Sequence, residues 1–165
     1  MADDEAGTPV LVHVYDLSAG FAKDLSPLLL GKQIEAIWHT GVVFGGVEYY
    51  FGQGINRAPA GQTPFGQPNQ VISMGNTFVP ASIAEEVISD LARTKFSPTS
   101  YSLLKNNCNH FSTELCTVLV GKGIPDKIVR LPEDVLDSPM GFLLGPILDQ
   151  LEQQLGSVGT GTEFT

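Results

Sequence analysis

The chain has 165 residues, the size of one ordinary domain, and 42% of them are hydrophobic against 16% charged. Eighteen acidic residues against nine scattered basic ones give a net charge of −9, which disfavours binding to nucleic-acid phosphates. No apolar run approaches the roughly 18 residues that a membrane span needs.

The beginning of the chain predicts a protein of the cytoplasm that can also enter the nucleus. Residues 1–5 are acidic, where a secretory signal would be basic and then apolar, and we expect residues 1–8 to be disordered. On one helix Cys108 and Cys116 would lie about 12 Å apart, too far for a disulfide. Two free thiols suit a reducing compartment.

The first half of the chain predicts strands. Residues 10–15 are rich in β-forming side chains, and the strand-like runs 37–44 and 47–51 flank Gly45-Gly46, a two-residue hairpin signal. Residues 52–70 are rich in glycine and proline and predict a long irregular loop. A short strand is expected over 71–74.

The second half predicts helices. Ser82 to Glu85 has the pattern of a capping box and predicts a helix after it. We expect this helix to bury one face, formed by Ile83, Val87, Ile88 and Leu91. Asn107 is a suitable N-cap for a second helix that ends at Gly121. We expect that helix to turn inward Phe111, Leu115, Val118 and Leu119.

The C-terminal part is expected to lie apart from the core. Leucines at helical spacing predict an amphipathic helix over 141–155, and the Gly- and Thr-rich residues 156–165 predict a flexible tail. The helix is expected to pack on its own domain; pairing with a second copy as a homodimer, or binding a partner, are the alternatives.

Cys108 is the candidate nucleophile. At the start of a helix, unpaired backbone N–H groups and the helix dipole stabilise a thiolate, and the same N–H groups can hold an oxyanion. The alternative is a buried structural cysteine, but the flanking Asn107 and Asn109 are not typical of an apolar setting. Cys116, in the middle of the same helix, is expected to be a core side chain.

His39 is the candidate base among three histidines. His110 follows Cys108 by two residues and would point away from it on a helix, so it is expected to anchor the helix start. His13 lies inside the first strand with no cue to a function. His39 shares a strand face with Gly41, which leaves space around the imidazole. Geometry alone leaves this choice open.

Three segments together resemble the PPPDE family of permuted-papain-fold peptidases, which includes the desumoylating isopeptidases (DeSI). They are 11–18 (LVHVYDLS), 38–42 (WHTGV) and 106–111 (NNCNHF), and the resemblance covers a catalytic domain of residues 9–140. It implies an α+β, circularly permuted papain-like fold. In this fold a small antiparallel sheet packs against helices, and the catalytic cysteine begins a helix.

The resemblance also implies the chemistry. Cys108 and His39 would form a catalytic dyad that removes SUMO, or ubiquitin, from substrate lysines through a thioester. Candidates for an oxyanion donor or an orienting group are Tyr15, Asp16 and Asn107. A narrow slot for the modifier's tail would be lined by Trp38, Gly41, Gly52 and Gly54, although turns and core packing explain these residues as well.

Two other classes of function remain open. A protein thioesterase, such as a depalmitoylase, would use the same dyad with a deep apolar channel in place of a slot. A non-catalytic binding module is the third hypothesis. No cofactor is expected, and Cys108, His110 and Cys116 lack the spacing of a zinc site.

Overall fold

The computed structural model describes residues 6–18, 38–130, 153 and 162–163. The expected C-terminal helix over 141–155 therefore lies, apart from residue 153, outside the described residues.

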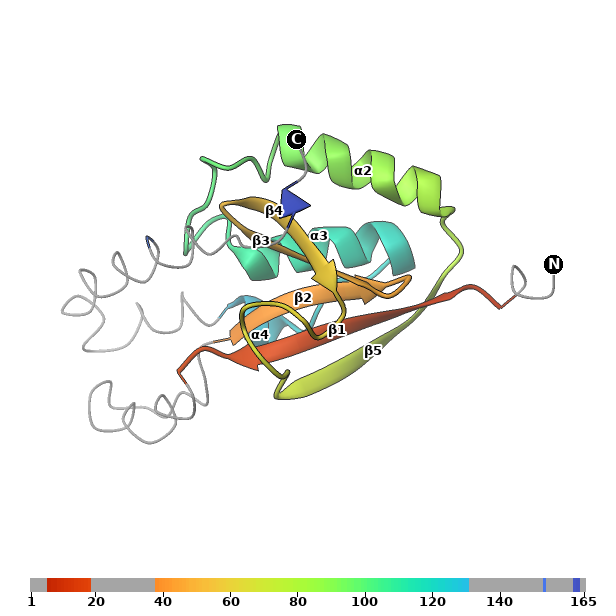
Figure 1. Ribbon diagram of the computed structural model, residues 1–165, viewed down its shortest axis with the longest axis horizontal. Helices are drawn as coiled ribbons and strands as arrows, with labels where there is room; N and C mark the ends of the chain where they lie inside the picture. Colours follow the sequence, from red (N-terminus) through yellow and green to blue (C-terminus); the bar gives the residue numbers. More distant parts are fainter. Residues whose placement is uncertain (1–5, 19–37, 131–152, 154–161, 164–165) are drawn as a thin grey trace.

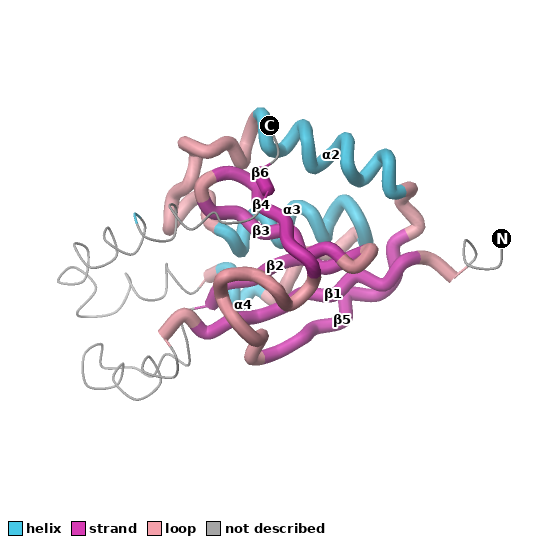
Figure 2. The backbone as a smooth tube through the Cα atoms, in the orientation of Figure 1, coloured by secondary structure: helices cyan, strands magenta, loops and turns pink. Residues whose placement is uncertain are grey.

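The described part is a sheet with helices on one side (Figures 1 and 2). The strands follow the order β5-β1-β2-β3-β4-β6, and every pairing is antiparallel. Their bounds are β1 Thr8–Asp16, β2 Trp38–Phe44, β3 Val47–Gly52, β4 Gly54–Pro59, β5 Gln70–Thr77 and β6 Thr162–Glu163. The predicted α+β class, with an antiparallel sheet and helices, is confirmed.

The hairpin of β2 and β3 forms as predicted. Gly45 and Gly46 both have positive φ, 59° and 76°, as a tight two-residue turn between twisted strands requires. On the other side of β2, strand β1 pairs along its length, and Tyr15 lies opposite His39. The histidine strand is thus a central strand of the sheet.

Several predicted boundaries were wrong. The glycine- and proline-rich stretch is not one loop, because Gly54–Pro59 forms β4 and only residues 60–69 are irregular. Backbone pairing with β3 overrides the local composition there. Thr8, expected to be disordered, begins β1, and Thr162 and Glu163, expected in a flexible tail, pair with β4.

Helix α2, Ala81–Arg93, begins without the predicted capping box. Its N-cap is Pro80, and no side chain caps the helix. The buried face consists of Ala84, Ile88 and Ala92, whereas Ile83 is exposed. Starting the helix at Ala81 puts Ser82 inside the first turn, where it cannot serve as the cap.

Helix α3, Cys108–Val120, agrees closely with its prediction. Asn107 is the N-cap, and Gly121 ends the helix in the left-handed conformation with φ 78°. Phe111, Leu115 and Leu119 are buried, and only Val118 departs from the expected face, since it is exposed. A short helix α4, Asp126–Val129, follows.

The sheet has two differently covered faces. One packs against α2 and α3 and holds the apolar core, including Val12, Val42, Phe51 and Phe111. Figure 1 shows the loop between β4 and β5 crossing the other face, with α3 behind the sheet. Side chains that alternate along a strand therefore enter two environments, and this decides the surroundings of His39 and Thr40.

Candidate active site

Cys108 is the first residue of α3 and is buried. The side chain of Asn107 accepts hydrogen bonds from the N–H groups of Asn109 and His110, and the His110 ring accepts one from Asn107 N–H at 3.0 Å. This reciprocal capping box confirms the predicted N-cap and the predicted anchoring role of His110. Asn107 also donates to the Leu103 carbonyl at 2.6 Å, so the residue before Cys108 is tied to the preceding loop.

The head of α3 takes the place of β3 beside the start of β2. Strands β2 and β3 pair only over Val42–Phe44, so the backbone from Trp38 to Thr40 has no β3 partner. Asn109 donates to the Trp38 carbonyl at 3.1 Å, and the Thr40 hydroxyl lies 2.8 Å from both Asn109 Oδ1 and Ser112 Oγ. The nucleophile helix and the histidine strand are thus joined directly by buried hydrogen bonds.

The Cys108 sulfur lies against this junction. The backbone of Thr40 and the hydroxyl of Tyr101 lie close enough to the sulfur to lower the thiol pKa. Burial outweighs them and raises the pKa of Cys108 to about 11. The backbone of Cys108 and Asn109 at the helix start also lowers this pKa, but the resting sulfur is a neutral thiol.

Tyr101 is a site residue that the sequence analysis missed. It lies seven residues before Cys108 in a loop, and its ring packs on Phe51 with centroids 5.2 Å apart. Asn106 holds this loop together by donating to the carbonyls of Lys95 and Ser100. The only sequence signal was an aromatic residue shortly before the asparagine pair, which is too common a pattern to single out.

His39 lies in a cage of aromatic rings. The imidazole stacks on Phe65 with centroids 3.7 Å apart, and the rings of Tyr15 and Tyr50 lie 5.7 Å and 5.9 Å away. Its Nε2 atom is buried and has no hydrogen-bond partner within the described part of the chain. Burial lowers the pKa of His39 to about 3, so the imidazole is neutral at physiological pH.

The structure brings Cys108 and His39 to neighbouring positions without joining their side chains. The sulfur contacts the backbone of Thr40, the residue after His39, but Thr40 turns its hydroxyl to α3 while His39 turns toward Phe65. No thiol–imidazole hydrogen bond is present among the described residues. Such contacts commonly tighten only when substrate binds.

Two of the three candidate orienting groups serve other contacts. The Tyr15 hydroxyl, a candidate oxyanion donor, donates to Glu48 at 2.7 Å and so faces away from the sulfur, although its ring flanks His39. Asp16 accepts from the backbone and hydroxyl of Ser18 and so shapes the end of β1. Asn107 precedes Cys108 and caps its helix.

The glycines of the expected slot have structural reasons of their own. A Cβ on Gly41 would lie 2.7 Å from Glu48 Oε2, so that position is filled by a carboxylate. Gly52 and Gly54 flank the turn between β3 and β4, where Gly54 has φ +87° and abuts Pro98. Trp38 packs partly against the core. Gly52, Gly54 and Trp38 thus agree with the alternative of turns and core packing, whereas Gly41 makes room for a side chain. A slot lined by these residues stays a prediction.

We expect alkylation to distinguish the two cysteines. Cys116 is fully buried in the apolar core, and burial raises its pKa to about 12. Because the pKa of Cys108 is raised to about 11, the thiolate fraction grows about tenfold per pH unit from pH ~7 to ~10. The rate of its alkylation by iodoacetamide should rise in the same proportion. Mass spectrometry of Cys108→Ala and Cys116→Ala measures each thiol alone. A plateau of the Cys108 rate near pH ~8 would contradict a neutral resting thiol.

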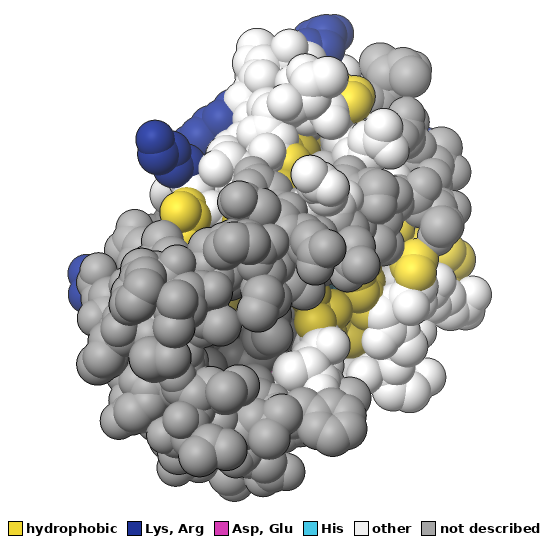
Figure 3. Space-filling view, turned by 90° about the vertical axis from the view of Figure 1, so that its left-hand side faces the viewer, with side chains coloured by type: hydrophobic (Ala, Val, Ile, Leu, Met, Phe, Trp, Pro, Cys, Tyr) yellow, Lys and Arg dark blue, Asp and Glu magenta, His cyan; other side chains and the backbone are white. Residues whose placement is uncertain are grey.

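The end of the molecule where β2 and α3 begin is seen in Figure 3. Hydrophobic side chains of the described residues reach its surface in several places. Across the described ranges, no helix has the length and hydropathy of a membrane span.

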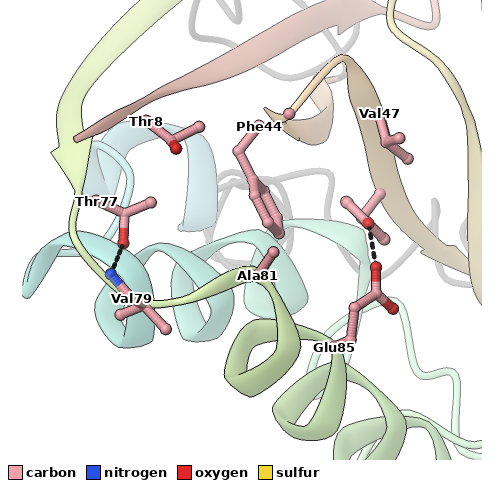
Figure 4. A pocket seen from close by; sticks show the side chains of 9 residues that line it. Thr8, Phe44, Val47, Thr77, Val79, Ala81 and Glu85 are labelled. Carbon is pink, nitrogen blue, oxygen red and sulfur yellow. Dashed lines mark hydrogen bonds between the residues drawn. The ribbon is translucent and has the colours of Figure 1, made fainter. Parts of the chain in front are cut away.

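A separate pocket of about 190 Å³ lies at the opposite end of β2 (Figure 4). Phe44, Val47 and Val79 line it, and Glu85, at its edge, accepts a hydrogen bond from the Tyr49 hydroxyl at 2.9 Å. Neither His39 nor Cys108 borders this pocket, so it is distinct from the candidate active site.

Comparison with known proteins agrees with the resemblance. Residues 8–149 match the PPPDE putative peptidase domain. The chain is 44% identical over 147 residues to desumoylating isopeptidase 1 of Homo sapiens, covering 88% of each chain. It is 43% identical over 146 residues to the Xenopus laevis protein of that name, covering 88% of this chain and 86% of the other. A DeSI-like protein of Schizosaccharomyces pombe is 30% identical over 132 residues, 74% of this chain and 63% of that one.

Proposed function

The chain belongs to the PPPDE peptidase family, and from this premise we propose that it is a cysteine isopeptidase that removes SUMO from substrate lysines. The observation that carries the proposal is the position of Cys108 at a capped helix start, joined by hydrogen bonds to the strand that bears His39. The names of the relatives supply the substrate class.

The proposed reaction begins from a neutral pair. Because burial raises the pKa of Cys108 and lowers that of His39, proton transfer must accompany attack and not precede it. His39 takes the thiol proton as Sγ attacks the carbonyl carbon of the modifier's C-terminal glycine. The Cys108 N–H and the Tyr101 hydroxyl are the donors we assign to the oxyanion.

The second half of the reaction returns the proton. His39 protonates the lysine amine as the isopeptide C–N bond breaks, leaving a thioester on Cys108. A water molecule, deprotonated by His39, then hydrolyses the thioester. This sequence requires the imidazole to turn from Phe65 toward the head of α3, where the sulfur lies against the backbone of Thr40.

Electrophilic modifiers test the proposal. SUMO with a C-terminal vinyl sulfone should form an adduct at Cys108, which Cys108→Ser abolishes and Cys116→Ala retains. Ubiquitin vinyl sulfone and a fatty-acyl thioester are run in parallel, to test a second modifier and the thioesterase alternative. If the protein hydrolyses the thioester and forms no adduct with either modifier, the assigned function changes from isopeptidase to acyl-protein hydrolase. An adduct at Cys116 would overturn the assigned nucleophile.

A further inference from the structure

A buried carboxylate lies on the same face of the sheet as His39. Glu48 of β3 is 0% exposed, and its Oε1 lies 2.7 Å from His13 Nδ1. Oε2 accepts from the Tyr15 hydroxyl at 2.7 Å, and Oε1 also accepts from the Gly61 N–H at 3.1 Å. A carboxylate without water is costly unless it is paired in this way.

The strand that bears His39 leaves room for this carboxylate. Gly41 lies two residues from His39 on the same face, and a Cβ there would come within 3.0 Å of three Glu48 atoms. The carboxylate thus occupies the place of a side chain next to the imidazole along β2. Its partner His13 lies opposite Gly41 on β1.

Glu48 holds two parts of the cage around His39. Its bond to the Tyr15 hydroxyl fixes the ring that lies 5.7 Å from the imidazole. Its bond to Gly61 fastens the start of loop 60–69, which carries Phe65, the ring stacked on His39. The far end of that loop is fastened to β1, because Asn69 N–H donates to the Val14 carbonyl at 2.8 Å.

We propose that Glu48 is a positioning residue that limits the orientations open to the imidazole of His39 by holding Tyr15 and the Phe65 loop. The inference rests on the proposed function, because it assigns His39 the role of base. Glu48 touches neither the sulfur nor the substrate; it acts through the rings against His39. The imidazole must turn from Phe65 to reach Sγ, and fixed rings around it restrict the orientations between which it turns. A loosened cage would add orientations in which no ring nitrogen reaches Sγ.

The chain offers a matched control on the other face of the sheet. Glu85 of α2 also accepts a hydrogen bond from a tyrosine hydroxyl, that of Tyr49, at 2.9 Å. That pair borders the pocket at the far end of β2, away from His39. Glu85→Gln therefore removes a carboxylate from a similar pair without affecting the cage.

The test compares Glu48→Gln, Tyr15→Phe and Glu85→Gln. Hydrolysis of a SUMO isopeptide substrate should lose roughly 10- to 100-fold in kcat for Glu48→Gln, with KM changed less than about twofold. Tyr15→Phe keeps the aromatic ring and loses only the hydrogen bond from its hydroxyl to Glu48. We expect it to lower kcat by a smaller factor, again with little change in KM. Glu85→Gln should leave both constants unchanged.

A second measurement does not depend on hydrolysis. In a Cys108→Ser background, the NMR signal of the His39 Cε1–H group should carry a ring-current shift from Phe65, because the two ring centroids lie 3.7 Å apart. Glu48→Gln should reduce or broaden this shift, and Glu85→Gln should not. If Glu48→Gln does not fold, Tyr15→Phe provides both readings.

The outcomes separate this inference from the proposed function. An unchanged kcat together with an unchanged His39 signal in Glu48→Gln, or in Tyr15→Phe if only that variant folds, overturns the positioning role. An equal loss in Glu85→Gln also overturns it, because the effect would then be general destabilisation. If the unmodified chain does not hydrolyse SUMO conjugates, the proposed function fails, and the His39 signal alone decides whether Glu48 orders the imidazole.

Discussion

Cys108→Ser should lower the turnover of a SUMO isopeptide substrate roughly 10³-fold or more while leaving the fold intact. A serine hydroxyl is nearly isosteric with the thiol, and the first position of α3 does not depend on a sulfur. It is, however, a much poorer nucleophile when the base assigned to it is a neutral imidazole with a pKa lowered to about 3. Single-turnover hydrolysis followed by gel electrophoresis measures the loss, and circular dichroism checks the fold.

Cys116→Ala is the control for this experiment. Cys116 lies in the core, eight residues further along the same helix, and its replacement leaves a small cavity. We expect a modest loss of unfolding free energy, about 1 kcal/mol, and unchanged turnover. Retained activity in Cys108→Ser, or its loss in Cys116→Ala, would contradict the assignment of the nucleophile.

His39→Ala should lower kcat by roughly 10²- to 10⁴-fold, the usual contribution of a general base. The vacated space is lined by the rings of Phe65, Tyr15 and Tyr50, so added imidazole should restore part of the rate. His110→Gln is the control, because the His110 ring accepts the capping bond from Asn107 N–H and glutamine also suits that position. Rates with and without imidazole measure the effect.

The pH dependence of kcat/KM is a second test of His39 as the general base. Burial lowers the pKa of His39 to about 3, so the imidazole stays able to accept a proton well below its ordinary range near 6.5. The acid limb of kcat/KM should therefore lie below pH ~5, and it should be absent in His39→Ala. A limb near pH ~6.5 would mean that the base is solvated or is a different group.

The local sequence was informative where one residue type determines the backbone. The Gly45-Gly46 hairpin, the Asn107 cap and the left-handed Gly121 each depend on a side chain's own conformational preference. The expectation of a core thiol at Cys116 depended only on its place within a helix. These features were predicted correctly without any knowledge of the packing.

Other features depend on contacts between distant segments. Strand β4 forms in a stretch of turn-forming residues because β3 offers it a partner, and composition cannot show that. The contact of Gly41 with Glu48 crosses from one strand to the next. The stack of Phe65 on His39 joins a loop to a strand 26 positions earlier in the chain. Local patterns carry no information on such pairs.

The hydrogen bonds between the head of α3 and the start of β2 have a mechanical consequence. The nucleophile lies on α3 and the base on β2, and hydrogen bonds of Asn109 and Thr40 join these two elements where β3 does not pair with β2. Fluctuations elsewhere in the sheet would therefore move α3 and the start of β2 together and leave the distance between their backbones unchanged. The adjustment left for catalysis is then a rotation about side-chain bonds, which is far faster than any movement of whole strands.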